Sequence, residues 1–222
     1  LGSAEGIDLD VARAFVRRPE GGEGAAGPRW DEHDVLVLGE LPEGSVTAAD
    51  AARVGGLVSE RARGLVVMSG PAALAKSPVR GLVPAAIPDF TPAGPAKVSP
   101  TAAGRGHPAL RVTERAGDSA DAWSRLAALG DFPAAVRPRP GAEALLEAGV
   151  ARPVLVAGRL GTGRVAAVLS GETHVWADDP DAPPEAYARL LRSLVAWAAG
   201  RESSSDVISV DVARRRVRRG DL

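Results

Sequence analysis

The segment from His33 to Ser69 places two uninterrupted apolar runs on either side of a helix-sized stretch. The first run, HDVLVLGELP, and the second, GLVVMS, show no alternation with polar residues, which is typical of strands buried on both faces of a parallel sheet. Between them, SVTAADAARVGGLVSERARG predicts a helix with Thr47 as N-cap, Asp50 three residues later and Gly64 at the C-terminal end. Strand, helix and strand in this order predict an α/β protein, because a parallel neighbour needs a crossover of that length.

The remaining periodicities extend this pattern along the chain. The segment 71–106 is rich in Pro, Ala and Gly, and we expect irregular structure there, with a short helix and one edge strand near 96–98. The other predicted elements are a strand at 8–17, a helix at 118–129, strands at 141–149, 152–160 and 163–172, and an amphipathic helix at 183–200. The linker RESSSD at 201–206 separates this domain, residues 1–200, from the start of a following β-rich segment that completes residues 201–222.

Composition excludes several classes of function. The 222 residues contain no cysteine and three histidines that are far apart, so we expect no disulfide, no thiolate nucleophile and no metal site. The net charge of −1 gives no field that favours nucleic acid. No apolar run approaches the roughly 18 residues of a membrane span. The chain begins without Met, and we expect it to be part of a longer protein whose membrane anchors lie elsewhere.

The glycines of GRLGTGRV, residues 158–165, resemble a phosphate-binding loop. Such a loop needs a strand before the glycines and a helix after them, so that the helix N-terminus faces the phosphate. Here a second strand follows instead, which favours a β-hairpin with its positive φ angles at Thr162 and Gly163. We therefore predict no bound cofactor.

Ser69 follows a predicted buried strand and precedes a predicted helix start, which is where many α/β enzymes hold a nucleophile. A hydrolase elbow has the pattern G-x-S-x-G, whose glycines let the strand turn sharply. In this chain Val67 and Pro71 stand at the two glycine positions. Ser69 therefore stands where a nucleophile elbow would be, but the two glycines of the elbow pattern are missing.

A nucleophilic serine also needs a base, and His174 is the candidate. His174 follows the predicted strand at 163–172, and Glu172 or Asp178 could orient its ring. If the two strands are parallel neighbours, Ser69 and His174 could meet at the C-terminal edge of the sheet. The alternative is that Ser69 only ends a strand and His174 lies on a surface loop.

The loop after residue 172 contains an aromatic residue and several acids. Trp176 either covers the sheet end or a ligand cleft, or packs into the core. The acids of DDPDAPPE lack the regular alternation of a Ca²⁺ loop and favour a solvated helix entry.

The ordered set of segments resembles a known family. The segments are DVLVLGELP, ARGLVVMSGPAAL, HPALRV, DAWSRLAAL, RPGAEALLE, RPVLVAGRLGTGRVAAVLSGETHVWA and YARLLRSLVAWAAG. Together they resemble the glutamine amidotransferase-like domain of bacterial membrane-anchored proteins that also have von Willebrand factor A domains. The resemblance covers roughly residues 1–200.

This resemblance implies a class I glutamine amidotransferase-like fold. That fold is a flavodoxin-like three-layer α/β/α sandwich with a mostly parallel sheet, here with a C-terminal β-hairpin, a final helix and its first strand missing. Such enzymes use a Cys on the elbow, and a His followed two residues later by a Glu. The corresponding positions here are Ser69–Gly70, His174 and Trp176, so the thiol and the Glu are both absent. The resemblance therefore implies the fold and argues against the activity.

The sequence as a whole predicts a catalytically inactive, pseudoenzyme-type domain. It would act as a binding or structural module of a larger cell-envelope protein, on the extracytoplasmic side, with other domains of the same polypeptide as its partners. Two alternatives remain: a serine-dependent hydrolase that uses Ser69 and His174, and a small-ligand sensor. The cleft in either case would be lined by Gly39, Glu40, Ser69, Gly70, His174 and Trp176.

Overall fold

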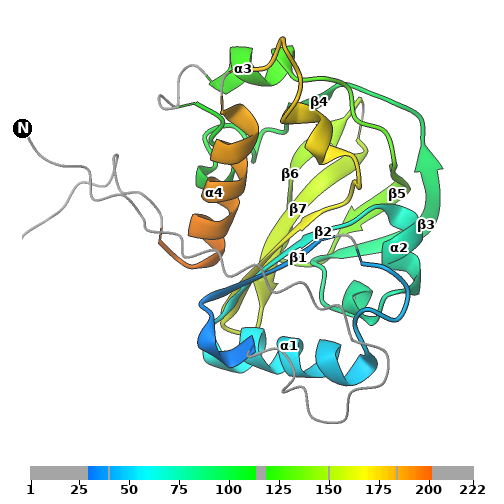
Figure 1. Cartoon of the computed structure of the whole chain (residues 1–222), viewed down its shortest axis with the longest axis vertical. Coiled ribbons are helices and arrows are strands. Elements are labelled where there is room, and N and C mark those ends of the chain that lie inside the picture. Colours follow the sequence, from blue (N-terminus) through cyan, green and yellow to red (C-terminus); the bar gives the residue numbers. More distant parts are fainter. Residues whose placement is uncertain (1–29, 40, 114–118, 150, 184, 202–222) are drawn as a thin grey trace, which may run out of the picture.

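A six-stranded mixed sheet forms the centre of the molecule (Figure 1). The computed structural model describes residues 30–39, 41–113, 119–149, 151–183 and 185–201. The sheet has the strand order β1 (Val35–Gly39), β2 (Gly64–Met68), β8 (Gly163–Val168), β7 (Pro153–Leu160), β6 (Glu143–Ala148) and β4 (Val98–Pro100). A second sheet pairs β3 (Ala85–Ala93) with β5 (Phe132–Pro138). The predicted strand at 8–17, the segment 202–222 and Glu40 lie outside the described residues.

The predicted flavodoxin-like sandwich with a mostly parallel sheet is wrong. Only β1, β2 and β8 run parallel, and the pairings of β8 with β7, β7 with β6, and β6 with β4 are all antiparallel. The reason is the length of the connections. A parallel neighbour needs a crossover of a dozen residues or more, whereas β6, β7 and β8 follow one another through short turns and must alternate in direction.

The predicted crossover helix between β1 and β2 is present as α1 (Ala48–Arg61). Thr47 and Asp50 form a reciprocal capping box, in which the Thr47 side chain accepts from the Asp50 backbone N–H and Asp50 accepts from the Thr47 backbone N–H. The helix ends at Ala62, whose φ of 55° is left-handed. Gly64 therefore belongs to β2, where a Cβ atom would lie 2.6 Å from the Ala198 carbonyl oxygen.

The predicted hairpin joins β7 to β8, with Leu160 opposite Gly163. Its positive φ is at Gly161, at 59°, and not at Thr162 or Gly163 as predicted. The tip packs against the end of α1: the Thr162 backbone N–H and hydroxyl both donate to the Ser59 carbonyl, each at 2.9 Å. The glycine-rich segment is therefore a tightly packed turn.

Helices cover both faces of the central sheet (Figure 1). One hydrophobic cluster lies under α3 (Ser119–Arg125) and α4 (Ala186–Ala198), and includes Val66 of β2. The other lies under α1 and α2 (Pro71–Lys76), and includes Leu65 and Val67. Alternate residues of β2 thus point into different clusters, which explains why its sequence is apolar throughout. None of the described helices is long and apolar enough to cross a lipid bilayer.

Short 3-10 helices complete the described structure. They are η1 (Trp30–Glu32), η2 (Pro78–Gly81), η3 (Pro108–Leu110) and η5 (Thr173–Trp176). The last of these follows β8 after residues 169–172 and positions part of the candidate site.

Candidate functional site

The parallel pairing of β2 and β8 brings two similar segments to the same edge of the sheet. Met68 is opposite Val168, and the Ser69 backbone N–H continues the ladder by donating to the Val168 carbonyl at 3.0 Å. Each strand is then followed by a Ser-Gly pair, Ser69–Gly70 and Ser170–Gly171. We call the residues Ser69, Gly70, Gly130, Asp131, Ser170, Gly171 and Glu172 the strand-end corner.

Ser69 lies beneath the surface of this corner. Its side chain is buried, at 2 % exposure, and the hydroxyl donates to the Gly70 carbonyl at 3.3 Å. Gly70 is the N-cap of α2, whose first residue is Pro71. The hydroxyl therefore bonds to its own local backbone and is closed off from solvent.

His174 lies at the same edge of the sheet, in η5, but is exposed. Its Nδ1 is 3.2 Å from the Gly171 carbonyl. Within the described residues, no hydrogen bond joins His174 to Ser69. Glu172 does not orient the imidazole either, because its Oε2 accepts from the Gly130 backbone N–H at 2.8 Å.

Asp131 occupies the space above the two Ser-Gly pairs. A Cβ atom added to Gly70 would overlap Oδ2 of Asp131, and one added to Gly171 would lie 2.9 Å from the same oxygen. Gly70 has an ordinary φ of −68°, so the backbone does not require glycine there. A side chain at position 70 would meet the carboxyl group of Asp131, which would have to move to make room for it.

The environment of Asp131 raises the pKa of its carboxyl group. Burial is the main cause and the negative charge of Glu172 is the second, while a hydrogen bond from the Gly171 backbone N–H acts in the opposite direction. The backbone of Asp131 is also left-handed, with a φ of 47°. A perturbed carboxyl on an unusual backbone at the carboxyl ends of parallel strands is typical of functional positions.

Side-chain hydrogen bonds hold the loop that contains Asp131 against β8. The Ser170 hydroxyl donates to the Gly130 carbonyl at 3.0 Å and accepts from the Glu172 backbone N–H at 3.1 Å. Together with the bond from Gly130 N–H to Glu172, these contacts fix Gly130 from both sides. Sequence reasoning missed Asp131 because no motif marks it; a Gly-Asp pair before an apolar run was the only local signal.

The other predicted cleft residues have different surroundings. Gly39 is exposed at the end of β1, beside Met68. Trp176 lies in the core at 2 % exposure, where its Nε1 donates to the Ala127 carbonyl at 2.9 Å and its ring meets Trp123 edge-on at 5.7 Å between centroids. Trp176 therefore packs inside the molecule and does not line a cleft.

The acidic loop before α4 has a structural role. Asp179 accepts from the Ala127 backbone N–H at 2.7 Å through Oδ2 and from the Asp181 backbone N–H at 3.0 Å through Oδ1. In the part of the chain that the structure describes, no three His, Asp or Glu side chains gather in a way that could hold a metal ion.

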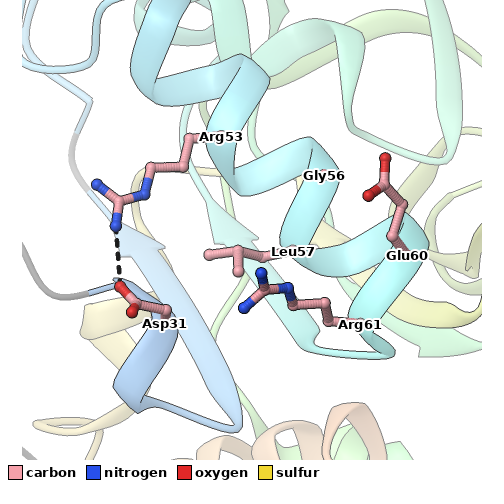
Figure 2. Close-up of a pocket in the computed structure, with 6 residues that line it drawn as sticks. All are labelled: Asp31, Arg53, Gly56, Leu57, Glu60 and Arg61. Atoms are coloured by element: carbon pink, nitrogen blue, oxygen red, sulfur yellow. Dashed lines mark hydrogen bonds and ion pairs between the residues drawn. The ribbon is translucent and has the colours of Figure 1, made fainter.

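A surface hollow of about 270 Å³ lies at the opposite end of the sheet, between η1 and α1 (Figure 2). Arg53 donates to Asp31 across it at 2.9 Å, and both side chains are about half exposed. Hydrogen bonding by its own backbone N–H and the charge of Arg53 lower the pKa of Asp31. Leu57, Glu60 and Arg61 complete the lining with Gly56. Exposed pairs of this kind contribute little energy, and the charges nearly balance.

Comparisons with known proteins find similar folds and assign no function to the chain. No family model and no curated protein matches the chain. The chain is similar to the cytoplasmic protein STM3548 from Salmonella typhimurium, at 15% identity and a TM-score of 0.58, over 78% of this chain and 76% of that one.

Two further solved structures also match the chain. The cytoplasmic protein STM1381 from Salmonella typhimurium LT2 matches at 14% identity and a TM-score of 0.52, over 75% of this chain and 72% of that one. The exo-beta-1,4-mannosidase Op5Man5 from Opitutaceae bacterium strain TAV5 matches at 19% identity and a TM-score of 0.44, over 74% of this chain and 25% of that one. At such identities the first two likenesses show a shared mixed α/β fold alone.

Proposed function

We propose that this chain is a non-catalytic binding or structural module of a larger protein. The observation that carries the proposal is the position of Asp131, whose carboxyl group lies on Gly70 at the corner where an α/β enzyme would bind the reacting group of its substrate. Ser69 itself is buried at 2 % exposure, so a substrate carbonyl has no open approach to its hydroxyl. The absence of cysteine supports the same conclusion, since the chain has no thiolate nucleophile.

The bonding of the two candidate catalytic residues also supports a non-catalytic role. Ser69 is buried and bonded to Gly70, and His174 is exposed with its Nδ1 near the Gly171 carbonyl. A serine nucleophile is activated when a base lies within hydrogen-bond reach of its hydroxyl. One observation favours the alternative of a serine hydrolase: β2 and β8 are parallel neighbours, so both residues do lie at the same sheet edge.

Labelling with a fluorophosphonate probe distinguishes the two functions. We expect no covalent labelling of the folded chain, and no difference between the parent and its Ser69→Ala and His174→Ala variants. A known serine hydrolase in the same reaction shows that the probe is active. Labelling of the parent that disappears in both variants would establish the hydrolase and reject the non-catalytic module.

We further propose that the larger protein belongs to the cell envelope and that the other domains of its polypeptide are the partners of this module. The support is the resemblance of the ordered segments to domains of membrane-anchored proteins. Fractionation of cells that express the full-length protein, followed by immunodetection of this domain, tests the location. We expect the domain in the membrane fraction and accessible to protease added outside the cytoplasm; recovery in the soluble cytoplasmic fraction contradicts the location.

A further inference from the structure

β1 is an edge strand of the central sheet, and its outer side is open in the described part of the chain. It stands at one end of the strand order, and no described strand pairs with it there. On its inner side, the Asp34 carbonyl accepts from the Gly64 backbone N–H of β2. Because successive residues of a strand direct their backbone groups to opposite sides, the residues that face the open edge are Val35, Val37 and Gly39. Such an edge is a template for a further strand.

An apolar side chain is exposed at the same edge. Val37 is 51 % exposed, more than any other large hydrophobic side chain in the described residues. Its neighbours Leu36 and Leu38 belong to the cluster under α1, so Val37 points to the opposite face, on the side of α4. On that face Val35 packs against the cluster under α4. The α4 face of β1 is therefore covered at its start and open at Val37.

The described chain ends beside the start of this edge. After α4, the Arg201 guanidinium donates to Oδ2 of Asp34 at 2.9 Å, and Asp34 immediately precedes β1. The Arg201 backbone N–H donates to the Ala196 carbonyl at 2.9 Å. Both side chains of the ion pair are more than half exposed, so the pair contributes little energy. Its value here is positional: residue 202 begins next to the first residue of β1.

The sequence that follows Arg201 has the pattern of a strand. Residues 202–222 lie outside the described residues, and within them VISVDVA, residues 207–213, alternates apolar with polar or small positions. The linker before it, residues 202–206, can span about 17 Å when extended. Neighbouring strands are only about 4.8 Å apart. The linker is therefore long enough to bring residue 207 to the edge of β1.

The connection through α4 also has an allowed topology. A strand that starts beside the first residue of β1 and follows it runs parallel to β1. The helix α1 connects β1 to β2 on one face of the sheet, and α4 would connect β8 to the new strand on the other face, in the opposite direction across the sheet. Reversing both the face and the direction preserves the handedness of the crossover. Both connections therefore have the same hand, as parallel crossovers almost always do.

We propose that residues 207–213 add to the open edge of β1 as a parallel strand. The apolar residues of this strand, on the same face as Val37, are Ile208, Val210 and Val212. The added strand goes beyond the proposed function, because it concerns how the sheet is completed, whatever the strand-end corner does.

A second segment of the chain has nearly the same sequence and is the competing occupant. IDLDVARAFVRR, residues 7–18, matches ISVDVARRRVRR, residues 208–219, at most positions. Residues 7–18 would have to pair with β1 as a hairpin through residues 19–34, a much longer connection than the two to five residues typical of hairpins. The ion pair of Arg201 with Asp34 and the short linker after it favour residues 207–213.

Amide hydrogen exchange, followed residue by residue by NMR in the whole 222-residue chain, tests the added strand. The Val37 N–H faces the open edge, and the Leu38 N–H faces β2. In the parent we expect both to exchange at least about tenfold more slowly than unprotected amides. A Val37 amide that exchanges without protection while Leu38 is protected overturns the proposal.

Adjacent proline substitutions identify the strand that protects Val37. Of Ser209→Pro and Val210→Pro, one removes an N–H that points to β1, so at least one should speed exchange at Val37 about tenfold or more and leave Leu38 unchanged. Val217→Pro, beyond the alternating residues, is the matched control and should behave as the parent does. Protection of Val37 that survives both tail substitutions overturns the proposal.

Two further outcomes would assign the edge to another occupant and also overturn the proposal. Loss of protection in Asp8→Pro or Leu9→Pro, and not in the tail variants, assigns the edge to residues 7–18. Protection of Val37 that falls on dilution of the protein assigns it to a second copy of the chain.

Cross-linking keeps the proposal testable if the proline variants do not fold. The chain has no cysteine, so Val37→Cys can be combined with one cysteine at a time at positions 208–212. Under mild oxidation we expect disulfides within one chain at 208, 210 or 212, where the side chains share the face of Val37, and none at 209 or 211. Equal cross-linking at all five positions, or disulfides between chains only, overturns the parallel strand.

Discussion

At the scale of single residues, one carboxyl group and the glycines beneath it define the candidate site. Asp131 has an unusual backbone, a raised pKa and a carboxyl group that lies where a side chain at position 70 would be. Each of these properties depends on residues that are distant in the chain. An isolated Asp in a loop has none of them, so no local pattern marks Asp131 as a candidate.

The placement of Trp176 leads to a residue-scale prediction. Trp176→Phe removes the N–H that donates to the Ala127 carbonyl and leaves that carbonyl without its partner. We expect the free energy of unfolding in urea to fall by about 1–3 kcal/mol, the usual cost of an unsatisfied buried group. His174→Ala, in the same 3-10 helix but exposed, is the matched control and should change it by less than about 0.5 kcal/mol. Equal effects of the two substitutions would contradict the buried position of Trp176.

Local residue patterns were predictable where neighbours in sequence are neighbours in space. The capping box of Thr47 and Asp50 needs only a three-residue spacing, and it forms as expected. Ser69 and His174 were predicted from the strands that precede them, and both do lie at the strand ends. The orientation of each side chain, toward the Gly70 and Gly171 carbonyls, depends on packing that the sequence does not display.

At the scale of elements, α1 shows how position within a helix decides the effect of a glycine. Gly55 and Gly56 are adjacent in the middle of α1. A Cβ at Gly55 would lie 3.1 Å from Cδ2 of Leu82, whereas one at Gly56 would have nothing within 4 Å. Alanine has the same propensity advantage over glycine at both positions, but only Gly56 has free space for the added methyl group.

We therefore predict different effects of alanine at the two positions. Gly56→Ala should raise the free energy of unfolding by about 0.5–1 kcal/mol, the helix propensity difference between the residues. Gly55→Ala should gain clearly less, because Leu82 must move. Thermal and urea unfolding of both variants measure this, and a larger gain at Gly55 would be inconsistent with the packing of α1 on Leu82.

Elements with strong local signals were predicted, and elements stabilised by distant pairing were not. The strands at β1, β2, β6, β7 and β8 and the helices α1 and α4 lie within the expected ranges. The sheet of β3 and β5 was missed because both strands contain prolines, which usually argue against a strand. These two strands pair in an isolated ribbon with register shifts, where edge positions tolerate proline.

At the scale of the whole molecule, the β7–β8 hairpin joins the sheet to α1. Gly161 at its tip has a φ of 59°, and a Cβ there would lie 2.7 Å from Cα of Ser59 and nearer still to its carbonyl oxygen. That helices and strands occur together could be predicted from the apolar runs and the helix-sized segments between them, but the mostly parallel sheet expected from this pattern was wrong. The direction of each strand could not, because it depends on which strands pair; the meander of β6, β7 and β8 made the sheet mixed.

The close contact of Gly161 with Ser59 predicts that one added methyl group lowers the stability of the whole chain. Gly161→Ala should destabilise the chain by the cost of a left-handed alanine, about 1–2 kcal/mol, and by an added cost of about 1–3 kcal/mol for displacing Ser59. Gly141→Ala is the control, because Gly141 has a φ of 79° and open space around it, so only the first cost applies. If the two variants unfold at the same urea concentration, the hairpin tip does not pack on α1 as described.

A double-mutant cycle between Gly70 and Asp131 tests the central claim most directly. Gly70→Ala should destabilise the parent by about 1–3 kcal/mol, because the new methyl group overlaps the Asp131 carboxyl. In the background of Asp131→Gly, which keeps the left-handed backbone at low cost, the same substitution should cost clearly less, because only the replacement of an N-cap glycine by alanine remains. The account predicts a coupling energy of at least about 1 kcal/mol between the two positions. An equal cost of Gly70→Ala in both backgrounds would contradict it, because the carboxyl of Asp131 would then not occupy the corner.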